Sequence, residues 1–181
     1  MPLTFVAIAS QDRSLYTIAS TVRVFKATAD GMYVPVACID DSADPADHRH
    51  TEVTFAEGRL SFKAAYDGPI LDHFIWPFAD QNNRTNLELH DFPRAQKSYF
   101  CSKDGFYPIK KDYDRQSFTI TIYSSTPIPR EDGMLFSTLA TIKETKKDDN
   151  GFQYVIQAEE NIPISLLMAI FSLPFTLLNI C

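Results

Sequence analysis

Short runs of alternating apolar and polar residues fill most of the chain, a pattern typical of half-buried β-strands. The clearest run is TEVTFAEGRLSFKAAY (51–66), where apolar residues alternate on both sides of a turn at Glu57-Gly58. SFTITIY (117–123) and FQYVIQA (152–158) repeat the pattern. YFCSKDGFYPIKK (99–111) predicts a hairpin that turns at Lys103-Asp104-Gly105. Before residue 160, no amphipathic helix of ten residues or more is evident, so the sequence predicts a mainly antiparallel β-protein.

Two turn residues refine this strand pattern in the first third of the chain. Asp30-Gly31 is a hairpin-type dipeptide that leads into YVPVACI. Pro35 interrupts that run, and because proline cannot donate to a strand ladder, it predicts an edge strand or a bulge.

The last 21 residues break the alternation, because NIPISLLMAIFSLPFTLLNIC carries no charged residue. We predict a helix over about Pro163–Leu173, with Asn161 as its cap and Glu159 and Glu160 complementing the positive end of its dipole. A helix that is apolar on all sides is either inside a membrane or buried inside the protein. The tail barely reaches the roughly 20 residues that span a bilayer, and Pro174 would kink it, so we favour burial.

A buried helix suits one kind of β-architecture in particular. The inside of a closed barrel surrounds a helix completely. We therefore predict a single domain over residues 1–181, with a β-rich body (1–160) that forms an antiparallel closed β-barrel around a C-terminal apolar helix (161–181). The alternative is a β-sandwich with the helix packed on one face.

Charge and cysteine content restrict the function. The chain has a net charge of −6, so we expect no nucleic-acid partner, because an acidic surface repels phosphates. The three cysteines form no CxxC pair, and no secretory signal is evident, which predicts a cytoplasmic protein. If its function is lipid binding, we expect it to associate with membranes. No GxSxG, HExxH, P-loop or GxGxxG motif occurs, so we expect a non-catalytic protein without a cofactor.

The end of the chain resembles the tubby-like superfamily, which includes tubby C-terminal domains, phospholipid scramblases and plant LURP-one-related proteins. STLATIKETKKDDNGFQYVIQAEENIPISLLMAIFSLPF carries the resemblance: a turn, a strand, an acidic cap with Asn and Pro, then an apolar helix. The resemblance covers about a quarter of the chain and implies a closed barrel threaded by the C-terminal helix. FVAIASQDRSLYTI also resembles the first hairpin of longin-type trafficking subunits, but the segments that follow keep strand periodicity.

Tubby domains bind phosphoinositide headgroups through surface basic residues, so the resemblance implies lipid contacts in the densest basic region. That region comprises Lys97, Lys103, Lys110, Lys111 and Arg115. Near an anionic surface each basic group contributes about 1 kcal/mol. Solvated turns are the simpler interpretation, because Asp104, Asp112 and Asp114 dilute the charge. A second basic group, Lys143, Lys146 and Lys147, is diluted in the same way.

Carboxylates and imidazoles, both metal-ligand types, crowd into IDDSADPADHRH (39–50). Asp44, Asp47, His48 and His50 are the candidate metal ligands, although their spacing fits no EF-hand and a solvated loop is the simpler interpretation. His73 and His90 stand alone in the sequence, and the apolar surroundings of His73 favour a partly buried histidine over a catalytic base.

The sequence favours two functions over a third, which is an enzyme or metal protein that uses the Asp/His loop (39–50). The first is a non-catalytic binding protein for phospholipid headgroups or a membrane surface. The alternative is a β-sandwich interaction or assembly protein whose apolar tail packs on a protein partner or anchors in a membrane. The sequence leaves the oligomeric state open.

Overall fold

A computed structural model describes most of the chain. The described residues are 2–13, 18–43, 50–55, 58–63, 65–66, 73–80, 82, 84–92, 94–103, 105–114, 117–131, 133–148 and 151–176. The strands are β1 (Leu3–Arg13), β2 (Ile18–Ala27), β3 (Tyr33–Ala43), β4 (His50–Phe55), β5 (Gly58–Lys63), β6 (Ala65–Tyr66), β7 (Phe74–Asp80), β8 (Thr85–Phe92), β9 (Lys97–Ser102), β10 (Gly105–Asp114), β11 (Ser117–Arg130), β12 (Gly133–Asp148) and β13 (Gly151–Ala158). Two helices follow, α1 (Ile164–Phe171) and α2 (Leu173–Thr176).

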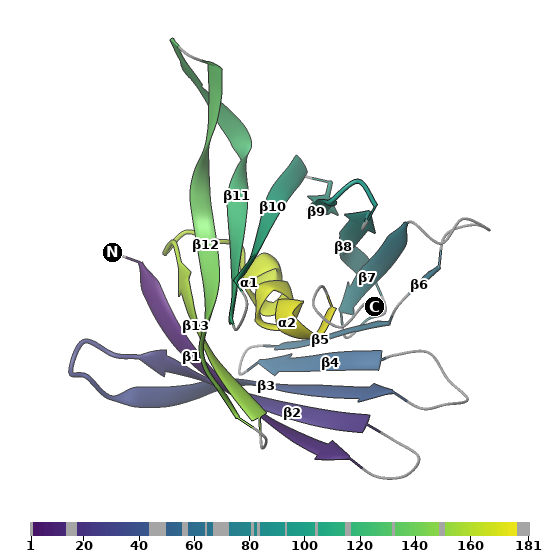
Figure 1. Cartoon of the computed structure of the whole chain (residues 1–181), viewed down its shortest axis with the longest axis vertical. Helices are drawn as coiled ribbons and strands as arrows, with labels where there is room; N and C mark the ends of the chain where they lie inside the picture. The colour runs from purple at the N-terminus through teal and green to yellow at the C-terminus, as the bar shows by residue number, and fades with distance from the viewer. Residues whose placement is uncertain are drawn as a thin grey trace.

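All described strands belong to one antiparallel sheet in the order β5-β4-β3-β2-β1-β13-β12-β11-β10-β9-β8-β7-β6. The sheet curls around α1, which lies on its concave side (Figure 1). β5 additionally pairs with β7 through residues 60–62 and 78–80. The prediction of a mainly β, antiparallel protein with a C-terminal helix is confirmed.

Alternating residues of the strands point to the concave side, as the sequence pattern predicts. Phe118, Ile120 and Ile122 of β11 are buried, and so are Tyr154 and Ile156 of β13. The hairpin over residues 51–63 also forms, but its turn lies one residue earlier than predicted. Gly58 already pairs with Phe55, so Gly58 is the first residue of β5.

The two turn residues in the first third also act as predicted. Gly31 adopts a positive φ of 79° in the connection between β2 and β3, a conformation that glycine takes without steric cost. Pro35 lies at a bulge, because Phe25 pairs with Pro35 and Val24 pairs with Ala37, which leaves Val36 as the extra residue.

The C-terminal segment forms the centre of the core. Every residue of α1 from Leu166 to Phe171 is buried, and Leu173 of α2 is fully buried. Phe171 packs edge-on against Phe5 of β1, with ring centroids 5.1 Å apart. No helix within the described residues is both long enough and apolar enough to cross a bilayer. The predicted burial of this segment is confirmed up to Pro174, and residues 177–181 lie outside the described part.

The predicted cap of this helix is wrong. Pro163, not Asn161, precedes the first helical residue, and no side chain caps the helix or places an acidic group in its first turn. The chain makes a turn first, in which the Ile162 N–H donates to the Glu159 carbonyl oxygen at 3.2 Å. That turn buries the Ile162 side chain and delays the helix to Ile164. The predicted helix is also interrupted near its end, because Ser172 separates α1 from α2. The Ser172 hydroxyl donates a hydrogen bond to the Ala169 carbonyl oxygen at 2.7 Å.

Tyr154 fixes the end of α1 against the sheet. Its hydroxyl donates to the Phe171 carbonyl oxygen at 2.9 Å, and both groups are buried. Burial raises the pKa of Tyr154 well above its ordinary value, because the phenolate would lose its hydration.

This burial predicts an alkaline loss of stability. An unfolded tyrosine ionises near pH 10, so the contribution of neutral Tyr154 is complete below about pH 10 and is lost as the pH rises toward the higher folded pKa. The loss is up to about 1.4 kcal/mol per pH unit. We expect Tyr154→Phe to lower the free energy of unfolding by about 1–3 kcal/mol at neutral pH and to flatten its alkaline decline. Urea unfolding across pH 8–12 measures both, and an equally steep decline in the variant would contradict the assignment.

Candidate functional site

The β9–β10 hairpin carries the candidate site. The hairpin forms where the sequence predicts it, but its turn ends before Gly105, because Gly105 already pairs with Ser102 as the first residue of β10. Gly105 adopts φ 137°, and a Cβ placed there would lie 3.2 Å from Cβ of Ser125 on β11. Glycine at this position therefore allows both the backbone angle and the close approach of β11.

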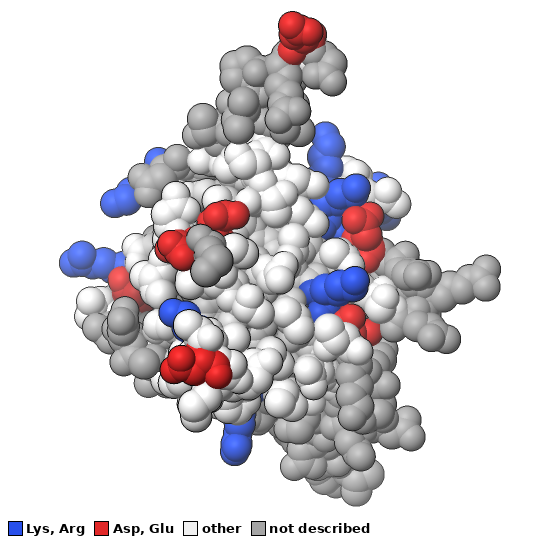
Figure 2. Space-filling view, turned by 90° about the vertical axis from the view of Figure 1, so that its left-hand side faces the viewer, with Lys and Arg blue, Asp and Glu red and all other residues white. Residues whose placement is uncertain are grey.

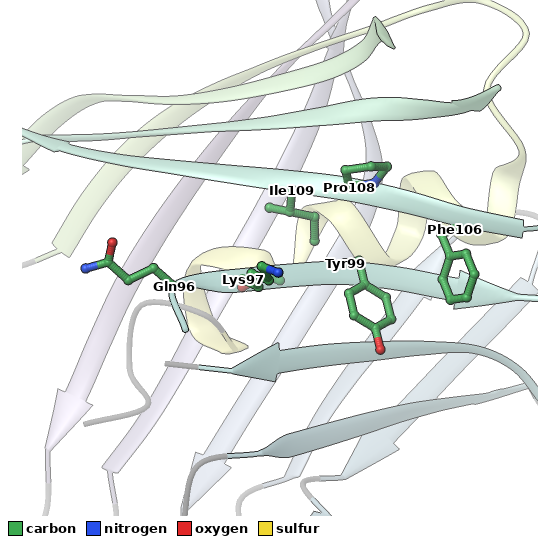
Figure 3. Close-up of a pocket in the computed structure, with 7 residues that line it drawn as sticks. Gln96, Lys97, Tyr99, Phe106, Pro108 and Ile109 are labelled. Atoms are coloured by element: carbon green, nitrogen blue, oxygen red, sulfur yellow. The ribbon is translucent and has the colours of Figure 1, made fainter. Parts of the chain in front are cut away.

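Aromatic and proline side chains line an open pocket on the outer face of this hairpin. Figure 3 shows Tyr99 of β9 and Phe106 of β10 projecting side by side, with Pro108 on the same strand as Phe106. The two rings meet edge to face with centroids 5.4 Å apart, and Phe106 is 58% exposed. The pocket volume is about 470 Å³, and Gln96 and Lys97 close one end of it.

Gln96 enters this pocket from a strained position. It lies in the turn that joins β8 to β9 and has φ 54°, the left-handed region that non-glycine residues seldom adopt. Unusual backbone conformations of this kind cluster at binding sites.

The structure describes four of the five predicted basic residues, and these four lie in three different settings. Lys97 and Lys110 are exposed and lie across the hairpin from each other, because the residues next to them, Ser98 and Ile109, form a pair. Both lie on the face of Tyr99 and Pro108, since residues two apart in a strand share a face. Lys103 is exposed in the turn at the other end of the hairpin. Arg115 lies outside the described residues.

Lys111 is separated from this group by the sheet itself. Its side chain lies on the concave side and is only 19% exposed, with Nζ 3.3 Å from Oδ1 of Asp91 on β8. The same Asp91 oxygen accepts a hydrogen bond from the Ser98 hydroxyl at 2.6 Å. Lys111 therefore belongs to a polar cluster behind the pocket and not to the predicted headgroup contacts. Sequence spacing could not separate Lys110 from Lys111, because only strand parity sends them to opposite faces.

A stack of rings extends from the pocket across β8 towards β7. His90 lies nearly parallel to Tyr99 at 5.0 Å, and His73 stacks on Phe92 at 4.0 Å. Nε2 of His90 is 2.9 Å from Oε2 of Glu88, and because a carboxylate accepts, His90 donates there. In the His90 tautomer that carries its proton on Nε2 alone, Nδ1 accepts from Nε2 of His73 at 3.1 Å.

This stack holds Tyr99 in place beside the pocket. Burial raises the pKa of the Tyr99 hydroxyl, and the nearby Cys101 and Glu88 charges raise it further. The partly buried, hydrogen-bonded His73 agrees with the prediction that it is not an isolated base. Its partnership with His90 was missed, because 17 residues separate them in the sequence; the placement of His90 opposite Ile75 in β7 brings them together.

The predicted metal ligands stay a prediction. Asp44, Asp47 and His48 lie outside the described residues, and only the backbone of His50 is described, as the first residue of β4. Across the described side chains, no group of three or more histidine, cysteine, aspartate or glutamate residues is arranged to hold a metal ion.

No family model, curated protein or solved structure matches this chain. Membership of the tubby-like superfamily therefore stays a prediction. The site itself brings together exposed ammonium groups, an exposed aromatic ring and an open apolar pocket on one hairpin.

Proposed function

We propose that this protein is a non-catalytic module that binds anionic membrane surfaces through the outer face of the β9–β10 hairpin. The observation that carries the proposal is the placement of Lys97 and Lys110 beside the same pocket as the exposed Phe106. Ammonium groups attract anionic headgroups, while an aromatic ring is favoured at the boundary between headgroups and acyl chains. Either group alone is common on protein surfaces, and their coincidence at a pocket supports the proposal.

The expected affinity is weak and reversible. Lys97, Lys103 and Lys110 would contribute about 1 kcal/mol each near an anionic surface. Burial of Phe106 adds about 1.5–3 kcal/mol. Asp112 opposes part of this attraction, since Oδ2 of Asp112 lies 3.8 Å from Nζ of Lys110. A total of about 4–6 kcal/mol corresponds to dissociation constants between about 1 mM and some tens of micromolar.

Vesicle co-sedimentation of the full chain tests this function. We expect binding to phosphatidylcholine vesicles that contain phosphatidylserine, and none to phosphatidylcholine alone. Raising the salt from about 0.1 M to about 1 M shortens the Debye length from about 10 Å to about 3 Å and should release the protein. Lys97→Gln with Lys110→Gln should weaken binding by roughly 30-fold, the equivalent of about 2 kcal/mol.

A matched control distinguishes the site from net charge. Lys26→Gln with Lys143→Gln removes the same charge from β2 and β12 and should leave vesicle binding within about twofold, because those residues lie on other strands. Equal losses in both double variants would mean that only net charge matters, and the proposed site would be wrong.

We propose further that the curled sheet is a closed barrel of the tubby-like type around α1. The pairing of β5 with β7 supports this, because these strands lie near opposite ends of the strand order. The buried helix α1 contacts β4, β5 and β8, which come from both halves of the strand order, and this supports the proposal as well.

A further inference from the structure

The β11–β12 hairpin extends beyond the strands next to it (Figure 1). β12 pairs with β11 as far as Gly133, but with β13 only from Ala140 onwards. The last described contact on that side is the Glu159 N–H, which donates to the Leu139 carbonyl oxygen at 2.9 Å. Within the described residues, the segment 133–138 of β12 therefore has a strand on one side only. We call the other side the β12 edge.

Two prolines determine which backbone groups face the β12 edge. Pro127 pairs with Phe136, and Pro129 pairs with Met134. Because proline has no N–H, these must be pairs that exchange no hydrogen bonds. In such pairs the N–H and C=O groups point away from the partner strand. The backbone groups of Met134 and Phe136 therefore point to the β12 edge.

Prolines block two other strand edges of the sheet, one on β11 and one on β3. In the same pairs, the backbone groups of Pro127 and Pro129 point to the outer edge of β11. Because proline has no N–H, each proline removes one hydrogen-bond donor from that edge. Pro35 does the same on β3, in the part that extends beyond the pairing of Ala37 with Phe55. Natural proteins use proline and charge to block such edges. The β12 edge, in contrast, has neither proline nor charge between Met134 and Ala140, and Phe136 is 37% exposed.

We propose that the β12 edge is a docking site for an extended segment of a partner protein, which adds to the sheet as a strand. In this mode main-chain hydrogen bonds supply affinity, and alternate side chains supply specificity. Met134 and Phe136 present the donors and acceptors, and Phe136 presents an apolar side chain. This site is separate from the β9–β10 hairpin and does not depend on the proposed membrane function.

Charge favours a foreign basic segment over a second copy of this chain. The exposed Glu159 and Glu160 follow the point where the β12 edge ends at Leu139. A second copy that paired its Phe136 with Met134 in antiparallel register would place its Glu131 opposite Leu139, close to Glu159. Like charges would then meet, whereas a lysine or arginine there would be attracted. Figure 2 looks onto this side of the molecule and shows mostly uncharged side chains, with acidic and basic side chains scattered among them.

The first experiment is selection from a phage-displayed library of random ten-residue peptides against the full chain. We expect enriched peptides to alternate apolar residues and to carry lysine or arginine near one end. The tightest peptide is then titrated by fluorescence anisotropy against the wild type and two variants of Phe136. Phe136→Ala keeps the N–H group and tests the side chain alone. Phe136→Pro removes an N–H group that β11 does not use, and should weaken binding about tenfold more than Phe136→Ala, through the lost hydrogen bond.

Two further variants keep the test decisive. Met134→Pro removes the other outward N–H group and replaces Phe136→Pro if that variant unfolds, as circular dichroism would show. Glu159→Lys should weaken the binding of the basic peptide while leaving the fold intact. The proposal is overturned if no peptide is enriched or if the peptide binds both proline variants as tightly as the wild type. It is also overturned if light scattering shows a wild-type dimer that Phe136→Pro dissociates, because the occupant is then a second copy.

Discussion

Ending the chain after Glu160 is expected to abolish the folded state. The truncation removes seven large side chains that are buried in the concave side of the sheet, namely Ile162, Leu166, Leu167, Met168, Ile170, Phe171 and Leu173. Each contributes about 1.5–3 kcal/mol when buried, which together amounts to about 10–20 kcal/mol. Because typical domains are stable by only 5–15 kcal/mol, the remaining strands should not hold a packed core.

Near-ultraviolet circular dichroism and thermal unfolding measure this result. We expect the truncated chain to lose its near-ultraviolet signal and its cooperative transition. Ile164→Ser is the matched control, since Ile164 belongs to the same helix but is about half exposed. That variant should change the free energy of unfolding by no more than about 0.5 kcal/mol. A truncated chain that unfolds cooperatively would show that the C-terminal segment is dispensable for the core.

Asp91→Ala is expected to lower the free energy of unfolding by about 3 kcal/mol. The Asp91 carboxylate is almost fully buried and holds both Lys111 and Ser98. Removing one partner of a buried ion pair costs about 3–5 kcal/mol, because the other charge stays buried without compensation. The lower end applies here, since Lys111 keeps partial contact with solvent.

A double variant separates the ion pair from simple packing. Asp91→Leu with Lys111→Met replaces both charges by apolar groups, and such replacements are often close to neutral. We therefore expect urea unfolding to show a much smaller loss for the double variant than for Asp91→Ala. The single variants Asp91→Leu and Lys111→Met are measured beside it. If the double variant loses as much free energy of unfolding as these two single variants together, Asp91 and Lys111 do not act as a pair.

Local patterns predicted the strands and the burial of the tail, because both depend on side-chain period. Strands such as SFTITIY bury every second residue, and that period is visible in the sequence alone. The absence of charge after Glu160 likewise predicted a buried helix, and the structure buries Leu166–Leu173.

Details that depend on contacts distant in sequence were not predictable. The cap at Asn161 was wrong because the burial of Ile162 delays the helix, which is a tertiary effect. His73 and His90 meet only because β7 and β8 pair. Lys111 follows Lys110 directly, yet it points to Asp91 on the opposite face. Four of the five predicted basic residues lie on the β9–β10 hairpin, but the fold turns Lys111 inward. The binding role of this cluster stays a prediction.

Hydrogen–deuterium exchange of the full chain, with and without phosphatidylserine-containing vesicles, tests most directly where the membrane would bind. We expect added protection in the turn at residues 94–96 and in β9 and β10, with no change at Met32, Tyr33 and Val34. Those three side chains are exposed and apolar but lie at the tip of the β2–β3 hairpin, so they are the natural competing site. Protection at that tip, with β9 and β10 unchanged, would contradict the proposed membrane-binding surface.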